Sequence, residues 1–174
     1  MAPLDSPLVS IIINCFNGEK YLKETLVSVL NQSYKNWEII FWDNQSIDKS
    51  KSIFNSFSDK RFKYFYAEQH TPLYKARNLA IEKSNGELIA FIDTDDLWKK
   101  NKLELQVSLF ANSKISLVYS NLWIIKENLK KKKIFIKKKL PSGFIFKELS
   151  DDYNVGIITV IFRKEILKDL KKIF

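Results

Sequence analysis

Short apolar runs alternate with amphipathic segments along the first two thirds of the chain. Four of these runs have the length and composition of strands, at residues 8–13, 37–42, 61–67 and 87–92, and those at 8–13 and 87–92 are typical of buried strands. Between the runs, apolar residues recur every three or four positions, as Leu22, Leu26 and Val29 do, which is typical of an amphipathic helix. The alternation predicts an α/β fold with a mostly parallel central sheet and helices on both faces.

The fourth apolar run stops abruptly in a cluster of carboxylates. Asp93, Asp95 and Asp96 follow it directly, and Gly86 precedes it. Length alone does not separate a buried strand from a buried helix, but the flanking Gly and Asp residues favour a strand. Asp is a poor strand residue, so we place the cluster just beyond the strand's carboxyl end. Open α/β sheets bind their ligands at this end of the strands.

Further elements follow from the same pattern. Ser46-Ile47-Asp48 offers an N-cap for a helix that runs to about Phe57. Two more helices have core faces that contain Ala76, Leu79 and Ala80, and Leu103, Val107 and Phe110. Beyond them we expect a strand at 115–119, a hairpin of 123–125 with 134–136, a turn and short helix at 140–149, a strand at 156–162 and a helix at 164–174.

The net charge gives only partial information about the partners of the protein. The chain has 29 Lys and Arg against 20 Asp and Glu, a net charge of +9, which suits an anionic partner without choosing one. Lysines are dense between residues 130 and 139. Solvated lysines that protect an exposed strand edge are the commoner explanation of such a run, and contact with an anionic membrane surface is the alternative.

Cysteine content and hydropathy bear on location. The single cysteine, Cys15, cannot form an internal disulfide and lies in an apolar run, where it is expected to be a small buried side chain in a reducing compartment. No signal peptide opens the chain, and no apolar stretch approaches the ~20 residues of a membrane-spanning helix. We expect a cytoplasmic protein, at most peripheral to the membrane.

Polar residues after three predicted strands should converge if the sheet is parallel. They are Asn14 after the first strand, Asp43 after the second, and Asp93, Asp95 and Asp96 after the fourth. Clustered carboxylates suit Mg²⁺ or Mn²⁺, and Mg²⁺ is usually held by one or two carboxylates together with substrate phosphates. The alternative is that Asp95 or Asp96 only caps a helix, and that Asp43 only begins a turn.

Two other side chains limit the chemistry. Arg77 lies on a polar helix face and is either a solvated charge or a phosphate ligand opposite the acidic cluster. His70 is the only histidine, so a Ser-His-Asp or Cys-His arrangement is impossible without it, and its loop favours a structural or solvated role. The chain contains no P-loop, no GxGxxG and no zinc-type spacing.

Five stretches in order resemble the N-terminal part of family 2 glycosyltransferases, which have the GT-A fold. They are Pro7-Leu8-Val9-Ser10-Ile11-Ile12-Ile13, Asn17-Gly18-Glu19-Lys20-Tyr21-Leu22, Ser28-Val29-Leu30-Asn31-Gln32-Ser33-Tyr34, Ala76-Arg77-Asn78 and Asp93-Thr94-Asp95-Asp96-Leu97-Trp98. A single motif of this kind is a weak signal. Five in the family's order, over about residues 7 to 111, are a strong one.

The resemblance implies roles for the residues at the strand ends. Asn14 and Asp43 would contact the nucleobase, and Arg77 would lie near the nucleotide. Asp95 and Asp96 would contact ribose and the metal on the diphosphate, with Asp93 in support. The family's mechanism is inverting: a base deprotonates an acceptor hydroxyl, which displaces the nucleoside diphosphate while the metal stabilises the leaving group.

This chain departs from the family pattern at several places. Asn14-Cys15 replaces a Pro-Thr-like pair, Asn44 replaces a second acid, and Thr71-Pro72-Leu73-Tyr74 replaces a glycine-containing loop. The catalytic base is expected in an acidic motif beyond Phe174. Asp151 and Asp152 are available carboxylates with no positional reason to be the base.

The resemblance implies an inverting, metal-dependent glycosyltransferase of surface polysaccharide or lipopolysaccharide synthesis. Residues 1–120 would bind the donor, most plausibly a UDP-sugar, and residues 121–174 would form a basic hairpin and the start of the acceptor side, all in one domain. The chain would bind donor only, with a glycan or lipid-linked acceptor in the full enzyme, and no nucleic acid. The alternatives are a sugar-nucleotide nucleotidyltransferase and a basic module for nucleic acid or a membrane surface.

Overall fold

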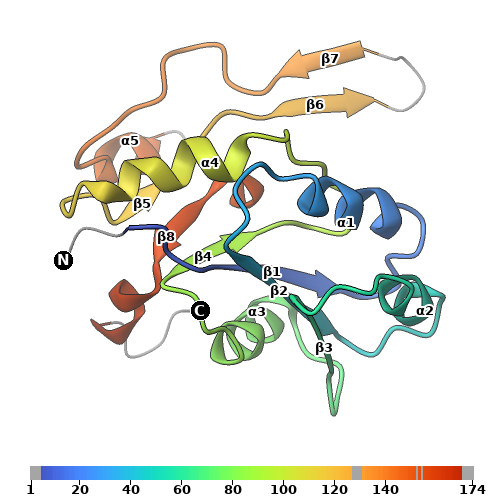
Figure 1. Ribbon diagram of the computed structural model, residues 1–174. Coiled ribbons are helices and arrows are strands. Elements are labelled where there is room, and N and C mark those ends of the chain that lie inside the picture. The colour runs from blue at the N-terminus through green and yellow to red at the C-terminus, as the bar shows by residue number, and fades with distance from the viewer. Residues whose placement is uncertain (1–4, 127–130, 152, 154, 170–174) are drawn as a thin grey trace.

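The computed structural model describes residues 5–126, 131–151, 153 and 155–169. Its central sheet has six strands in the order β3-β2-β1-β4-β8-β5, seen in Figure 1. The strands are β1 (Val9–Cys15), β2 (Trp37–Asp43), β3 (Phe62–Tyr66), β4 (Leu88–Phe91), β5 (Leu117–Val118) and β8 (Ile161–Arg163). The α/β fold predicted from the alternation of apolar runs and helical spacing is confirmed.

Four strands form the parallel heart of the sheet. β1 pairs in parallel with β2 on one side and β4 on the other, and β2 pairs in parallel with β3. Every residue of β2 and of β4 is buried, which explains why apolar residues follow one another in these strands rather than alternating with polar ones, with Glu38 and the terminal Asp43 of β2 as exceptions. Because the chain first builds outward from β1 to β3 and then returns to the other side of β1, the topological switch point lies between β1 and β4.

Helices cover both faces of the sheet. One core, which includes Ile11 and Ile13 of β1, packs under α1 (Leu22–Leu30), α2 (Ser50–Asn55) and α4 (Lys102–Val107). The other, which includes Ile12 and Ile40, packs under α3 (Leu73–Glu82) and the 3-10 turn η4 (Lys164–Asp169). Alternate residues of β1 therefore belong to opposite cores, as the period of two in a strand requires.

Two local expectations are wrong, and a third is met. The helix expected after an N-cap in Ser46-Ile47-Asp48 is present as α2, which begins at Ser50, and the Asp48 carboxylate accepts the Ser50 N–H at 2.9 Å. The strand expected at 115–119 is reduced to the two residues of β5. The described part of the helix expected from Lys164 is a 3-10 turn, and residues 170–174 lie outside the described part of the chain.

The strand expected at 156–162 is also wrong. Residues 157–159 form a 3-10 turn, and the strand β8 is shorter and antiparallel to its neighbours β4 and β5. Side chains, rather than a neighbouring strand, donate hydrogen bonds to the main-chain carbonyls of this segment. The Trp98 indole N–H donates to the Ile158 carbonyl at 3.0 Å, and the Gln106 side-chain amide donates to the Thr159 carbonyl at 2.8 Å.

The expected hairpin is present, with its second strand shifted into the lysine run. β6 (Trp123–Lys126) and β7 (Lys131–Ile134) form a separate antiparallel sheet that lies beyond α4 in Figure 1. The expected short helix is α5 (Phe146–Asp151), while Asp152 lies outside the described residues. Among the residues that the structure describes, no helix is long and apolar enough to span a membrane.

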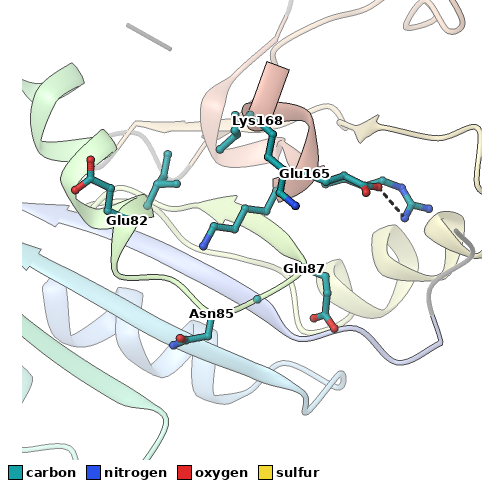
Figure 2. A pocket seen from close by; sticks show the side chains of 10 residues that line it. Glu82, Asn85, Glu87, Glu165 and Lys168 are labelled. Carbon is teal, nitrogen blue, oxygen red and sulfur yellow. Dashed lines mark ion pairs between the residues drawn. The ribbon is translucent and has the colours of Figure 1, made fainter. Parts of the chain in front are cut away.

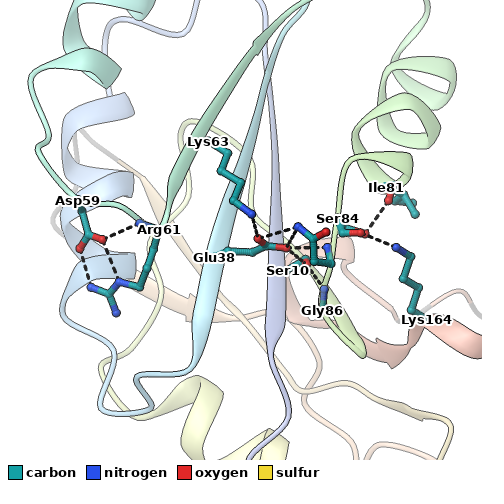
Figure 3. A network of polar contacts seen from close by, with 10 residues as sticks. Ser10, Glu38, Asp59, Arg61, Lys63, Ile81, Ser84, Gly86 and Lys164 are labelled. Atoms are coloured by element: carbon teal, nitrogen blue, oxygen red, sulfur yellow. Dashed lines mark hydrogen bonds and ion pairs between the residues drawn. The ribbon is translucent and has the colours of Figure 1, made fainter.

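A buried polar network joins the amino ends of the central strands (Figure 3). Glu38 of β2 is 4% exposed. Its carboxylate accepts hydrogen bonds from Ser10 Oγ at 2.6 Å, Lys63 Nζ at 2.5 Å and the Asn85 N–H at 2.7 Å. Ser10 Oγ in turn accepts the Gly86 N–H. The network fixes the register of three strands at the edge of the sheet opposite the carboxylate cluster.

Candidate donor site at the carboxyl ends of β1, β2 and β4

The loops after β1 and β2 are held together at the carboxyl edge of the sheet. The Asn17 side chain accepts the Ile47 N–H at 2.9 Å, while Asp48 accepts the Glu19 N–H at 2.9 Å. Ser50 Oγ accepts the Gly18 N–H at 3.0 Å. These reciprocal bonds make one platform from segments that are thirty residues apart in the sequence.

Gly18 brings this platform against the carboxylate loop. A Cβ atom at Gly18 would lie 2.8 Å from the Thr94 hydroxyl and 3.1 Å from Cys15 Sγ, closer than side-chain carbons normally approach. Only a residue without a side chain allows this distance between the two loops. The Asn17-Gly18 pair that the sequence marked as a turn is therefore also a contact point between the ends of β1 and β4.

Asp43 lies at the end of β2, fully buried. Its two carboxylate oxygens accept hydrogen bonds from the Ser46 N–H at 2.7 Å and the Tyr64 hydroxyl at 2.5 Å. Burial, together with this hydrogen bond to Asp43, raises the pKa of Tyr64, so the phenol stays a proton donor to the carboxylate. Tyr64 and Ser46 were not identified from the sequence, where Asp43 appeared alone at the strand end.

Asn44 and His70 shape the loop beside Asp43. The Asn44 side-chain amide binds the Thr71 main chain through both its oxygen and its nitrogen, at 3.1 and 2.7 Å. His70 Nδ1 lies 2.9 Å from the Asn44 carbonyl, and its ring packs edge-on against Phe16 at 4.4 Å. The structural role expected for His70 fits this position, and Asn44 fixes a loop rather than repeating an acidic ligand.

The carboxylate cluster lies in the loop after β4, as the sequence predicts. Asp95 is exposed, whereas Asp93 and Asp96 are half-buried. Burial, followed by the negative charges of Asp93 and Asp95, raises the pKa of Asp96 to about 6. A carboxylate with a raised pKa beside two others is a group whose ionised form a cation would stabilise strongly.

Arg77 and Asn14 face the same end of the sheet from different elements. Arg77 of α3 lies with Nη2 3.4 Å from Asp93 Oδ1, and its guanidinium stands 5.8 Å from the centre of the Phe91 ring. Asn14 is the last residue but one of β1, and its side-chain N–H₂ group is buried with no hydrogen-bond partner among the described residues. A buried donor without a partner is unusual and fits an oxygen acceptor supplied by a ligand.

Two side chains that the sequence did not single out hold the carboxylate loop by hydrogen bonds to its main chain. Thr25 of α1 donates to the carbonyls of Thr94 and Asp96, at 2.9 and 3.0 Å. Gln32 donates to the Lys99 carbonyl at 2.9 Å and accepts the Leu103 N–H. A signal for Thr25 was available, because it is a polar residue on the apolar stripe of Leu22, Leu26 and Val29.

Two hollows in the surface differ in their relation to this site. A cavity of about 490 Å³ lies at the amino edge of the sheet, lined in part by Glu82, Asn85, Glu87, Glu165 and Lys168 (Figure 2). A groove of about 730 Å³ between α1 and the carboxylate loop includes Val27, Asn31, Leu97 and Trp98. Only the groove adjoins the site, because Leu97 directly follows Asp96.

The residues present fit a divalent cation held jointly with a diphosphate. Within the described part of the chain, no three His, Cys, Asp or Glu side chains are grouped so as to hold a metal by themselves. Mg²⁺ and Mn²⁺ do not need such a cage, because one or two carboxylates plus phosphate oxygens and water complete their coordination. Asp96 and Asp95 are the carboxylates that we predict as ligands.

A model of the family described as glycosyl transferase family 2 matches residues 10–171 of the chain. The chain belongs to glycosyl transferase family 2. The GT-A fold expected from the resemblance is also confirmed, since solved structures of GT-A glycosyltransferases superpose on it. Staphylococcus aureus TarS 1–349 with UDP-GlcNAc matches at 22% identity and a TM-score of 0.73, over 92% of this chain and 46% of that one.

Among curated relatives of this family 2 chain, an Escherichia coli protein, UDP-Glc:alpha-D-GlcNAc-diphosphoundecaprenol beta-1,3-glucosyltransferase WfgD, is 35% identical over 94% of this chain. The putative teichuronic acid biosynthesis glycosyltransferase TuaG of Bacillus subtilis is 30% identical over 91% of this chain. The chain spans 63% of the length of each of these relatives. A mannosyltransferase of Pyrobaculum calidifontis with GDP-Man and Mn²⁺ has a TM-score of 0.72 at 18% identity, over 98% of this chain and 48% of that one.

Proposed function

We propose that this chain forms the donor half of an inverting, metal-dependent glycosyltransferase that uses a UDP-sugar. The observation that carries the proposal is that Asn14, Asp43 and the carboxylate loop lie at the carboxyl ends of the neighbouring strands β1, β2 and β4, beside the switch point between β1 and β4. Relatives in this family named for UDP-Glc and a diphosphoundecaprenol acceptor support a UDP donor and a lipid-linked acceptor. Surface polysaccharide synthesis at the cytoplasmic face of the membrane is the setting in which those substrates meet.

Each residue of the site has a proposed task. The buried N–H₂ of Asn14 and the carboxylate of Asp43 bind the nucleobase, and Asp93 orients Arg77 near the nucleotide. Asp95 and Asp96 hold ribose and the divalent cation, which when bound neutralises charge on the departing diphosphate. The acceptor hydroxyl loses its proton to a base, which we expect beyond Phe174, and bonds to the anomeric carbon of the sugar as the bond from that carbon to the diphosphate oxygen breaks on the opposite side.

Calorimetric titration of UDP tests the proposal. We expect UDP to bind in Mn²⁺ at least about tenfold more tightly than in EDTA, a difference of about 1.4 kcal/mol. Uridine without phosphate is the matched control, because it keeps the base and ribose contacts and lacks the diphosphate that the metal bridges. Its affinity should not change between Mn²⁺ and EDTA. Equal affinities of UDP in the two buffers would contradict a shared metal and diphosphate site.

A further inference from the structure

The β6–β7 hairpin stands apart from the central sheet and is fixed at its base. An isolated two-stranded hairpin is at best marginally stable in water. Here the Asn121 side chain donates to the Ile136 carbonyl at 2.6 Å and accepts the Ile136 N–H at 3.1 Å. Ile136 is 7% exposed, and Tyr119 bonds to the Pro141 carbonyl. The hairpin is therefore held in a defined place on the domain.

The hairpin exposes large apolar side chains on both of its faces. Trp123, Ile124 and Ile125 are 48, 42 and 55% exposed, and neighbouring Phe135 is 43% exposed. Because consecutive strand residues point to opposite faces, three such residues in a row leave neither face polar. Several large apolar side chains exposed together on one short hairpin mark a surface that contacts another apolar phase or a partner.

Basic side chains surround these apolar residues. Residues 128–147 contain eight lysines and no acidic residue. Of these lysines, Lys132 and Lys133 of β7 and Lys137, Lys138 and Lys139 beyond it are exposed. In the register of the hairpin, Lys132 lies opposite Ile125 and Lys133 opposite Ile124. Apolar side chains and unbalanced positive charge therefore occupy the same two strands.

We propose that the β6–β7 hairpin docks the protein on an anionic lipid bilayer. Lysines near such a surface contribute about 1 kcal/mol each, and Trp with aliphatic side chains enters the boundary between headgroups and acyl chains. Nucleic acid fits less well: Trp123 and Phe135 could stack on bases, but the aliphatic Ile124 and Ile125 could not, and the arginines of the chain, Arg61, Arg77 and Arg163, all lie outside the hairpin. This use of the surface goes beyond donor binding.

Docking at this place would hold the donor site at the bilayer. Lys99 Nζ lies 6.0 Å from the centre of the Trp123 ring, and Lys99 is three residues beyond Asp96. The rim of the carboxylate loop is thus in contact with the hairpin. The benefit of this placement for a lipid-linked acceptor rests on the proposed function, whereas lipid binding by the hairpin does not.

Tryptophan fluorescence with lipid vesicles tests the proposal. Trp37, Trp42 and Trp98 are 1, 7 and 7% exposed, so a change on docking reports mainly on Trp123. With vesicles of phosphatidylcholine and phosphatidylglycerol we expect a blue shift and co-sedimentation, both weakened several-fold when salt is raised to about 1 M, where the screening length is about 3 Å. Vesicles of phosphatidylcholine alone should bind at least about tenfold less protein.

Paired variants test whether vesicle binding depends on the hairpin itself or only on the net positive charge of the protein. Lys132→Glu with Lys133→Glu should lower vesicle binding at least about tenfold, and Ile125→Ser should lower it several-fold at unchanged charge. Lys51→Glu with Lys60→Glu makes the same charge change on exposed lysines of α2 and the loop after it, and should retain most of the binding. UDP titration of every variant shows whether the variant is folded. It also shows whether a loss of vesicle binding occurs without a loss of donor binding.

Three outcomes would overturn the proposal. The first is equal loss of vesicle binding in the hairpin pair and the control pair. The second is tighter binding to a single-stranded oligonucleotide than to anionic vesicles, again dependent on Lys132 and Lys133, which would make the hairpin a nucleic-acid surface. The third is a dimer in sedimentation velocity that Ile125→Ser disrupts, with no vesicle binding by the wild type, which would show that a second copy covers the patch.

Discussion

Replacing Asp96 with asparagine is expected to lower the affinity for UDP in Mn²⁺ about 100-fold, or about 2.8 kcal/mol. The change removes an anionic cation ligand while it keeps the size of the side chain. It also removes the repulsion from Asp93 and Asp95 that, after burial, raises the pKa of Asp96 to about 6. We therefore expect the unliganded variant to be at least as stable as the wild type in urea unfolding, because functional sites often carry such strain.

Glu82→Gln is the matched control for this experiment. It makes the same carboxylate-to-amide change on an exposed residue of α3, at the amino edge of the sheet (Figure 2). Its affinity for UDP should equal that of the wild type. A variant Asp96→Asn that binds UDP normally in Mn²⁺ would remove Asp96 from the metal site. One that loses UDP binding together with several kcal/mol of stability would point to a structural role for Asp96 instead.

Glu38→Ala is expected to lower the free energy of unfolding by about 1–3 kcal/mol, the cost of leaving a buried hydrogen-bonding group without its partner. The variant leaves the buried Ser10 hydroxyl without its acceptor and also removes the acceptor of the Asn85 N–H, which belongs to an exposed residue. Lys63→Met should lower stability by less, because Glu38 keeps the other donors and the Lys63 side chain is 39% exposed. Urea unfolding measures both changes, and equal effects would contradict this account of the network.

The pH dependence of the same network has a defined sign. Burial raises the pKa of Glu38, but hydrogen bonds from Lys63, Ser10 and Asn85 outweigh burial and hold that pKa below its ordinary value. A carboxyl whose pKa is lower in the folded protein adds stability above its unfolded pKa of about 4.3, and this contribution is lost as the pH falls through the folded pKa. The stability difference between the wild type and Glu38→Ala should accordingly shrink in acid.

The parallel half of the fold could be predicted because each of its buried strands is a mostly apolar run, in which the polar exceptions Ser10 and Glu38 are hydrogen-bonded to each other. These runs end in Asn14, Asp43 and Asp93, at or just beyond the carboxyl ends of β1, β2 and β4, because unpaired polar groups are costly between two apolar cores. The sequence therefore predicted that these residues follow parallel strands, and the structure places them at one edge of the sheet. The assignment of individual ligand contacts to these residues stays a prediction.

The local structure around β5 and β8 could not be predicted, because side chains distant in sequence determine it. Arg163 is 1% exposed and donates to the carbonyls of Phe110 and Ile115, each at 2.8 Å. These contacts join β8 to the segment before β5, across about fifty residues. Trp98 and Gln106 take the carbonyls of residues 158 and 159 in the same way. Apolar periodicity carries no information about such bonds, so a strand was expected where a 3-10 turn forms.

The Asn17-Gly18 pair shows the same limit within the site. Its turn was evident from the residue types, but the need for glycine beside Thr94 arises from the approach of two loops that are more than seventy residues apart. Thr25 and Gln32 hold the carboxylate loop by hydrogen bonds to main-chain carbonyls. Every residue has such a carbonyl, so the residue types in the loop do not reveal these bonds. Residues that act on the main chain of a distant loop leave no pattern in a single sequence.

The central claim is that a divalent cation and a diphosphate bind together at the carboxylate loop. Paramagnetic broadening of backbone amide resonances by Mn²⁺ in the presence of UDP tests it most directly. We predict strong broadening for residues 93–97 and for Gly18, which packs against Thr94, and none for residues 84–87 at the opposite edge of the sheet. Broadening centred on residues 84–87, or broadening of the loop that is the same with and without UDP, would contradict the claim.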